Sequence, residues 1–190
     1  MKNKVQKAIL ALLFMTSSHA AMADNGLQYS YAQFLYNSAE LGIADGSGFS
    51  FGGSFQLDTQ FYVRGDFQNL NMDEGIDNIR TIELGAGYIH PLGSMDLIAE
   101  VNYVDAEIEY DNRNTRDYDE TGFLFTGGLR TYLAPELEVN ASMNHLNLDG
   151  HDNYIQLGAN YRLTHVLAVD SGYRLGSDIE VFTIGARYIF

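Results

Sequence analysis

Alternation of apolar and polar side chains over short stretches constrains this chain more than any other feature of its sequence. In the last stretch, Phe182, Ile184, Ala186, Tyr188 and Phe190 fall on one face, and small or charged residues fall between them. Successive side chains of a β-strand point to opposite faces, so this period of two predicts a strand with one apolar and one polar face. A soluble sheet with an ordinary edge strand would fit this stretch equally well, and the rest of the chain must decide.

Nine earlier stretches repeat the pattern, and each is bounded by turn-forming or strongly polar residues. The ten predicted strands cover approximately residues 27–36, 49–57, 61–68, 81–88, 97–103, 123–132, 137–144, 155–163, 167–175 and 182–190. The phase of the first strand is ambiguous, because Tyr29 and Tyr31 fall on the opposite face from Phe34 and Tyr36. Eight strands is the alternative count, if the first or the ninth prediction is wrong.

The lengths of these strands and of their connections indicate a membrane barrel. A tilted strand crosses the apolar layer of a bilayer in about 9–11 residues. Long polar connections begin near residues 38, 70, 106 and 147, and short ones lie near 58, 91, 134 and 164, while the last connection, at Gly176, is short. Outer-membrane barrels have long outer loops and short periplasmic turns. The sequence therefore predicts an all-β, closed antiparallel transmembrane barrel, and a soluble β-sandwich or lipocalin-like barrel is the alternative.

The N-terminus has the pattern of a secretory signal: a basic start, an apolar run, and small residues that end at Ala23. We expect residues 1–23 to be cleaved and residues 24–190 to form the barrel. The 167 residues that remain hold eight arginines, no lysine and all 25 acids, which gives a net charge of −17. Such a charge disfavours nucleic acid as a partner. The absence of cysteine excludes a disulfide-stapled scaffold.

The polar face of the predicted strands carries equal numbers of arginines and carboxylates. With the apolar face toward lipid, ten charged residues point inward: Arg64, Asp66, Glu83, Glu100, Arg130, Glu138, Arg162, Asp170, Arg174 and Arg187. Isolated charges in a narrow interior are costly, so we expect ion pairs that largely fill the lumen, with Glu83 and Glu100 as natural partners for arginines. A narrow porin-like channel for small solutes is the alternative function.

The predicted outer loops are acidic, with twelve carboxylates at Asp73, Glu74, Asp77, Asp105, Glu107, Glu109, Asp111, Asp117, Asp119, Glu120, Asp149 and Asp152. We interpret them as a solvated face. Divalent cations that bridge them to lipopolysaccharide are the alternative, although no spacing matches a calcium-binding loop. We predict no resident metal or cofactor.

An enzymatic function has limited support. Asp149 and His151 form an Asp-x-His pair, and Asp73 and Glu74 are adjacent acids. These short pieces resemble the acid–His and paired-acid elements of omptin proteases, which are longer chains. We therefore expect no enzyme and keep an omptin-like surface hydrolase as a third possibility.

Repeated strand motifs, among them Leu84-Gly-Ala-Gly-Tyr88, Leu157-Gly-Ala-Asn-Tyr161 and Ile184-Gly-Ala-Arg-Tyr188, resemble those of small Gram-negative outer-membrane β-barrel proteins. Members of that group have been described as porin-like, as OmpA-like barrels, or as plant-immunity activators and quorum factors. The resemblance covers nearly the whole mature chain. It implies an outer-membrane location after export through the periplasm, and it carries over no catalytic residue.

The same resemblance gives the C-terminus a role in biogenesis. In outer-membrane barrels a terminal aromatic residue is read by the barrel assembly machinery, and here Phe182, Ile184, Tyr188 and Phe190 match that signal. We therefore expect a monomeric outer-membrane barrel with a structural or surface-interaction role. Its expected partners are outer-membrane lipid, lipopolysaccharide and the assembly machinery.

Overall fold

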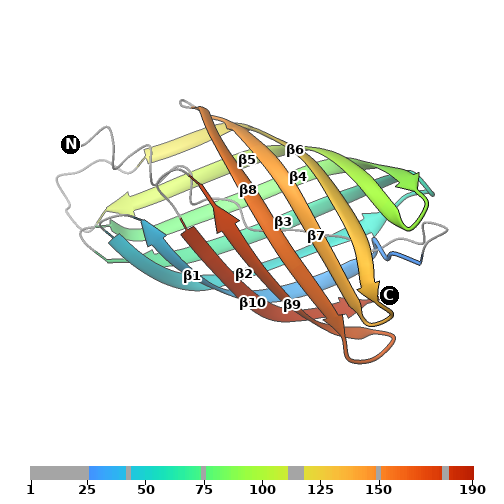
Figure 1. The fold of residues 1–190 in the computed structure, drawn as a ribbon. Helices are drawn as coiled ribbons and strands as arrows, with labels where there is room; N and C mark the ends of the chain where they lie inside the picture. The colour runs from blue at the N-terminus through green and yellow to red at the C-terminus, as the bar shows by residue number, and fades with distance from the viewer. Residues whose placement is uncertain (1–25, 42–43, 74–75, 111–117, 149–150, 177–179) are drawn as a thin grey trace.

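The computed structural model describes residues 26–41, 44–73, 76–110, 118–148, 151–176 and 180–190, which form a closed antiparallel barrel of ten strands (Figure 1). The strands are β1 (Tyr31–Leu41), β2 (Ala44–Gln56), β3 (Phe61–Met72), β4 (Ile76–Leu92), β5 (Met95–Tyr110), β6 (Tyr118–Ala134), β7 (Leu137–Asn147), β8 (His151–Arg162), β9 (Leu167–Leu175) and β10 (Glu180–Ile189). Ten strands are therefore confirmed, and the eight-strand alternative is wrong. The predicted signal, residues 1–23, lies outside the described residues.

Closure joins the two ends of the chain, because β1 pairs with β10 from Tyr31–Ile189 to Glu40–Glu180. All other pairs are between strands that follow each other in the sequence. The start of β1 and the end of β10 thus lie at the same end of the barrel as the short turns, and we call it the turn end. The opposite end is called the loop end. Among the described residues, no helix is both long enough and apolar enough to span a membrane.

Burial alternates along the strands as the sequence pattern requires. In β5, Asp96, Glu100 and Asn102 are buried, whereas Val101 and Tyr103 are exposed. The same alternation settles the ambiguous phase of the first strand. Tyr29 and Tyr31 point inward with at most 1% exposure, and Phe34 and Tyr36 point outward. Two tyrosines can face inward here because two arginines of the interior lie against their rings, as described below.

The outward face is an apolar band with a defined upper edge. Toward the loop end, outward residues change from apolar to polar within one step of the alternation on seven strands: Tyr36 to Ser38, Phe67 to Asn69, Ile82 to Arg80, Tyr103 to Asp105, Phe123 to Thr121, Met143 to His145, and Ile155 to Asn153. Aromatic rings gather close to this edge, where Tyr103 and Phe123 are 6.1 Å apart and Tyr36 and Phe49 are 5.6 Å apart. An apolar band flanked by aromatic residues is the outer surface of a transmembrane barrel.

Several strands continue past this band into segments that the sequence analysis assigned to loops. β5 runs to Tyr110, and β6 begins at Tyr118, with Glu107 paired opposite Asp119. The predicted loop starts near residues 38, 70 and 106 are therefore too early, because β1, β3 and β5 run to Leu41, Met72 and Tyr110, whereas the start near residue 147 agrees with the end of β7 at Asn147. Polar side chains suggested loops there, but main-chain pairing continues above the band because a strand in water tolerates polar residues on its outward face.

The short turns lie close to their predicted places. The turn between β4 and β5, predicted near residue 91, consists of Gly93 and Ser94, because β4 extends to Leu92 and β5 begins at Met95. Gly93 has a φ of 64°, a left-handed conformation that other residues adopt at a steric cost. This glycine allows β4 and β5 to pair up to the directly opposed residues Leu92 and Met95.

Candidate functional site: barrel interior and outer rim

Arg64 on β3 is the centre of the largest charge cluster inside the barrel. It forms ion pairs with Asp66 on the same strand and with Glu100 on β5, and its Nη1 lies 2.9 Å from Glu100 Oε2. Tyr62 donates its hydroxyl hydrogen to Glu100 Oε1 at 2.5 Å. These side chains are nearly inaccessible, and such charges are tolerated only when they are paired and hydrogen-bonded.

A second cluster joins β10 to β9 and β1. Arg187 Nε lies 2.7 Å from Asp170 Oδ2, and Asn160 donates to the other carboxylate oxygen at 2.7 Å. Arg187 also donates to Gln33 at 3.3 Å, and its guanidinium lies over the ring of Tyr31, 4.2 Å from the centroid. The arginine of the C-terminal strand is thus held by groups on two neighbouring strands, β9 and β1.

Arg130 on β6 forms the third cluster, nearer the turn end. Its Nε donates to Glu138 Oε1 at 2.9 Å. Its guanidinium lies 4.4 Å from the ring centroid of Tyr29, whose hydroxyl donates to Asp96 at 3.0 Å. Asp96 stands directly opposite Arg130 in the β5–β6 register. This cluster therefore connects the barrel wall to the segment that precedes β1.

The structure brings the remaining predicted interior residues together less directly. Arg174 is fully buried over the ring of Tyr154, 3.6 Å from its centroid. Arg162 is half-buried and donates to the hydroxyl of Tyr132. Glu83 forms no ion pair with an arginine among the described residues, and its Oε2 has no hydrogen-bond partner there.

The site prediction omitted the inward-facing tyrosines, Asp96 and Glu120 from the charged and aromatic interior. Tyr29, Tyr31, Tyr132 and Tyr154 each lie under an arginine guanidinium. Alternation alone could have placed Tyr154 and Asp96 inward, since they share the parity of Gln156 and Glu100. Arg174 meets Tyr154, and Arg187 meets Tyr31, across neighbouring strands of the barrel. Arg130 and Arg162 meet rings that are not on a neighbouring strand, so no single rule indicates which arginine each ring meets.

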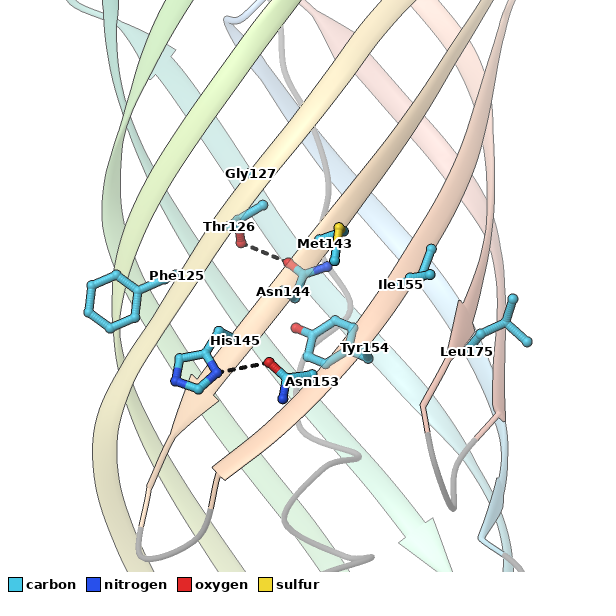
Figure 2. Close-up of a pocket in the computed structure, with 10 residues that line it drawn as sticks. All are labelled: Phe125, Thr126, Gly127, Met143, Asn144, His145, Asn153, Tyr154, Ile155 and Leu175. Atoms are coloured by element: carbon cyan, nitrogen blue, oxygen red, sulfur yellow. Dashed lines mark hydrogen bonds between the residues drawn. The ribbon is translucent and has the colours of Figure 1, made fainter.

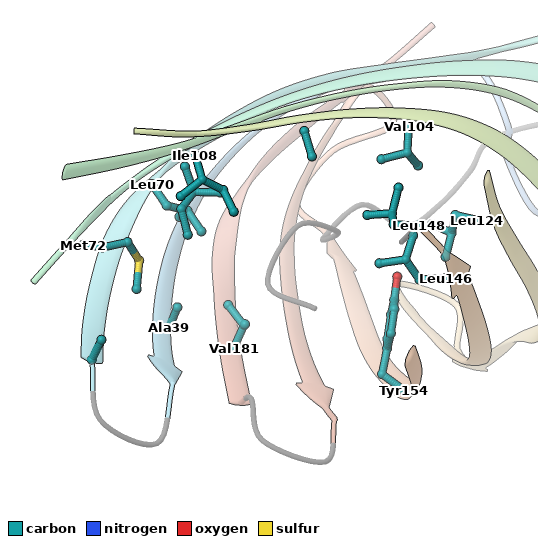
Figure 3. Close-up of a cluster of buried hydrophobic side chains, with 13 residues drawn as sticks. Ala39, Leu70, Met72, Val104, Ile108, Leu124, Leu146, Leu148, Tyr154 and Val181 are labelled. Atoms are coloured by element: carbon teal, nitrogen blue, oxygen red, sulfur yellow. The ribbon is translucent and has the colours of Figure 1, made fainter. Parts of the chain in front are cut away.

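Apolar layers lie on both sides of these clusters. At the loop end, buried side chains on the inner wall form one layer: Ala39, Ala44, Leu70, Met72, Ile79, Val104, Ala106, Ile108, Leu124, Leu146, Leu148, Tyr154 and Val181 (Figure 3). At the turn end, a second layer consists of Leu27, Tyr29, Tyr31, Tyr62, Ile89, Ile98, Ala168 and Ile189. From the loop end to the turn end, the interior therefore has an apolar layer, then the charge clusters, and then a layer of aromatic and apolar side chains.

The segment before β1 enters the turn end of the lumen. Leu27 and Tyr29 have no exposed surface. The carbonyl oxygen of Tyr29 accepts a hydrogen bond from Ser54 at 3.0 Å, and that of Ser30 accepts one from the Phe190 amide at 3.2 Å. Residues 26–30, which we call the N-terminal plug, are thus fixed to both β2 and the C-terminus.

The outer rim, above the apolar band, is acidic but partly neutralised. Arg80 on β4 lies 2.9 Å from Glu107 and 3.2 Å from Glu109. Glu120 points inward with 7% exposure, so it does not belong to the solvated face where the sequence analysis placed it. The described residues contain no group of three or more His, Cys, Asp or Glu side chains arranged to hold a metal. Glu74, Asp111, Asp117 and Asp149 lie outside the described residues.

Two histidines stand at the rim beside a hollow in the outer wall. His145 on β7 and His151 on β8 have ring centroids 5.7 Å apart, and His145 Nδ1 lies 2.9 Å from Asn153 Oδ1 (Figure 2). The hollow measures about 600 Å³ and lies against Phe125, Gly127, Met143, Asn144, His145 and Ile155, among other residues. The omptin-like pairs cannot be assembled from the described residues, because Glu74 and Asp149 lie outside them.

The C-terminal aromatic residues contribute little to packing. Phe182, Ile184, Tyr188 and Phe190 all point outward, and Phe190 is 59% exposed. Its ring centroid lies 6.3 Å from that of Tyr188. Within the protein this side chain has few contacts, and its exposed surface faces lipid, so its effect on stability should resemble that of other outward apolar residues.

The variant Phe190→Ala tests whether the terminal aromatic residue is needed for assembly in the cell or for the stability of the folded barrel. We expect the variant to refold in vitro and to lose only the free energy of transferring the phenylalanine surface from water to lipid, about 1–2 kcal/mol, a loss comparable to that of Met143→Ala. In cells we expect a clear loss of assembled barrel in the outer membrane, measured as heat-modifiable protein in membrane fractions. Met143→Ala, at another exposed outward position, is the control and should assemble normally. Wild-type assembly of Phe190→Ala would contradict an assembly signal.

Comparisons with known proteins agree with the barrel. Residues 8–162 match the model of a family described as the outer membrane protein beta-barrel domain. A solved structure of the KdgM porin has a TM-score of 0.52 and 12% identity, and it covers 83% of this chain and 99% of that chain. The KdgM porin in complex with disordered oligogalacturonate has a TM-score of 0.51 and 6% identity, with 84% and 99% covered. At these identities the likeness shows the fold alone. No curated protein matches the sequence.

Proposed function

The chain belongs to the outer membrane protein beta-barrel domain family, and we propose that it is a closed barrel whose outer rim is its working surface. It is an integral barrel of the outer membrane, so the soluble alternatives are wrong. We place the turn end in the periplasm and the loop end outside the cell, as in other barrels of this class. The observation that carries the proposal is the filling of the lumen along its axis.

Three layers in series support a closed lumen. In the layer at the loop end every side chain except that of Tyr154 is purely apolar, although the inward Glu120 stands opposite Ala106 there. Apolar constrictions close pores by dewetting. Below this layer, Arg64, Arg130 and Arg187 are each held by at least one carboxylate. At the turn end, the N-terminal plug fills the space between Tyr62, Asp96 and Arg130. A solute would have to displace all three layers.

A narrow channel for small solutes is the second candidate, and one observation favours it. Several inward polar atoms have no hydrogen-bond partner within the described residues, among them atoms of Gln68, Thr81, Glu83 and Asn102. Buried polar atoms of this kind are usually satisfied by water. The middle of the lumen is therefore suited to hold water, although the apolar layers at both ends separate it from bulk solvent.

Planar bilayer recording distinguishes the two candidates. We expect the refolded wild-type barrel to insert without stable conductance steps in concentrated potassium chloride. A stable, reproducible step that scales with the number of inserted barrels would contradict the closed lumen. A known open porin, inserted in the same membrane, serves as the control for insertion and detection.

With a closed lumen, the outer rim is the part of the barrel that can bind partners. Arg80 neutralises only part of the acidic face, and carboxylates at Asp105 and Asp119 remain exposed above the band. Hard divalent cations bind carboxylate oxygens and can bridge such a face to the phosphates of lipopolysaccharide. We propose lipid and lipopolysaccharide as the partners of a monomeric, non-enzymatic barrel, with export through the periplasm.

A further inference from the structure

We propose that His145 and His151 form a two-histidine binding site for a borderline transition-metal ion, such as Cu²⁺, Ni²⁺ or Zn²⁺, at the outer rim. The two residues lie diagonally across the β7–β8 pair, because His145 is paired with Asn153 and His151 is two residues before it. Both side chains are exposed on the outward face. They lie just above the apolar band, where an ion can reach them from water.

The hydrogen bond of His145 prepares the ring to bind a metal. An amide oxygen only accepts hydrogen bonds, so the contact with Asn153 Oδ1 at 2.9 Å places the proton on Nδ1 of His145. The other nitrogen, Nε2, then carries the lone pair that a metal requires. Metal-binding histidines commonly donate their second ring nitrogen to an oxygen in this way, which fixes both the tautomer and the ring orientation.

The distance between the two imidazole rings also agrees with the binding of one shared metal ion. Metal–nitrogen bonds of about 2.0–2.1 Å allow two imidazoles on one ion to have centroids up to roughly 6.5 Å apart. The observed separation is 5.7 Å. The rings are stacked, so rotation of the His151 side chain brings its nitrogen to the ion that Nε2 of His145 binds, while His145 keeps its hydrogen bond and the paired strands do not move.

Ligand chemistry selects the class of ion. Imidazole nitrogen suits Cu²⁺, Ni²⁺ and Zn²⁺, whereas Ca²⁺ and Mg²⁺ prefer oxygen. No third His, Cys, Asp or Glu completes the site within the described residues, so water would fill the remaining positions. Cu²⁺ is the sharpest probe, because it stands highest in the affinity order for nitrogen ligands.

The test is calorimetric titration of the refolded, full barrel in detergent with Cu²⁺ in a non-coordinating buffer. We expect His145→Ala and His151→Ala each to remove one equivalent of tight binding. Asn153→Ala should weaken that equivalent about tenfold, as expected when the partner that orients a metal ligand is lost. His90→Ala and His165→Ala, histidines at the turn end, are the matched controls and should bind as wild type. Copper bound elsewhere, including at the terminal amine, persists in the His145→Ala/His151→Ala double variant and is subtracted.

A second readout guards against misfolded variants. An ion that bridges β7 and β8 stabilises the folded state, so Cu²⁺ should raise the temperature at which the folded gel band of wild type converts to the unfolded band. Neither single histidine variant should show this rise. The proposal is overturned if His145→Ala keeps the tight equivalent or the thermal rise, or if His90→Ala loses them. Because conductance is not measured, failure here leaves the closed-lumen proposal untouched.

Discussion

Replacing Arg64 with alanine is expected to lower the free energy of unfolding by about 3–5 kcal/mol, the usual cost of removing one member of a buried ion pair. Arg64 is held by Asp66 and Glu100, and all three side chains are almost fully buried. The loss arises because two carboxylates remain in the lumen without the cation that compensates them. Urea unfolding of the barrel in lipid vesicles measures the change.

Arg80 provides a matched control within the same chain. It too contacts two carboxylates, Glu107 and Glu109, but its side chain is 41% exposed, above the apolar band. Solvent-exposed ion pairs contribute roughly 0–1 kcal/mol, so Arg80→Ala should be close to neutral. Equal losses for the two variants would contradict the importance of burial.

A rescue experiment tests the cause of the Arg64 effect. In the Arg64→Ala background, Glu100→Gln removes one uncompensated charge while it keeps an oxygen that can accept the hydrogen bond from Tyr62. The double variant should therefore be more stable than Arg64→Ala alone. If the loss came only from the missing packing of the arginine side chain, Glu100→Gln would recover nothing.

Strand number and face could be predicted because both depend on local alternation. Each strand's apolar residues must meet lipid, and a shift of one residue would turn Arg130 or Arg174 outward, so the register is strongly specified. Strand ends could not be predicted in the same way. Above the band, Asp105 and Glu107 look like loop residues, yet they continue β5 because main-chain pairing does not require apolar side chains.

Local sequence patterns could not predict which charged side chains form ion pairs inside the lumen. Glu83 and Glu100 both have inward parity, and both were expected to meet arginines. Glu100 reaches Arg64, whereas Glu83 forms no ion pair with an arginine among the described residues. Glu83 stands directly opposite Asp66 in the β3–β4 register, and Arg64 is already held by Asp66 and Glu100. The N-terminal plug was missed for a related reason, because Tyr29 was assigned to a strand of unknown phase.

The N-terminal plug leads to the second prediction, which concerns access to the lumen. Tyr29→Ala removes a ring that lies 5.2 Å from the ring of Tyr62, under the guanidinium of Arg130, and in hydrogen-bond contact with Asp96. Truncation of a large buried aromatic residue costs about 3–5 kcal/mol. If this free energy is lost from the binding of the plug to the lumen, the fraction of barrels open at the turn end should rise by a factor of roughly 100 or more. Each 1.4 kcal/mol changes an equilibrium constant tenfold.

Cysteine labelling measures this opening, because the native chain contains no cysteine. Ala168 belongs to the same turn-end layer as Tyr29 and has no exposed surface, so Ala168→Cys is a reporter that a charged, water-soluble methanethiosulfonate reagent should modify slowly in the closed barrel. In the Tyr29→Ala background we expect much faster modification. Tyr29→Phe keeps the ring and should stay slow, and Thr164→Cys in an exposed turn should react equally fast in every background.

The apolar layer at the loop end should limit what the same variant can conduct. Tyr29→Ala opens one end, but Leu70, Leu146 and their neighbours still close the other. We therefore expect fast labelling of Ala168→Cys without stable conductance steps in a planar bilayer. Fast labelling before Tyr29 is changed would show that the plug does not seal the lumen. Conductance after the single substitution would show that the apolar layer does not act as a barrier, and that the barrel is a gated channel.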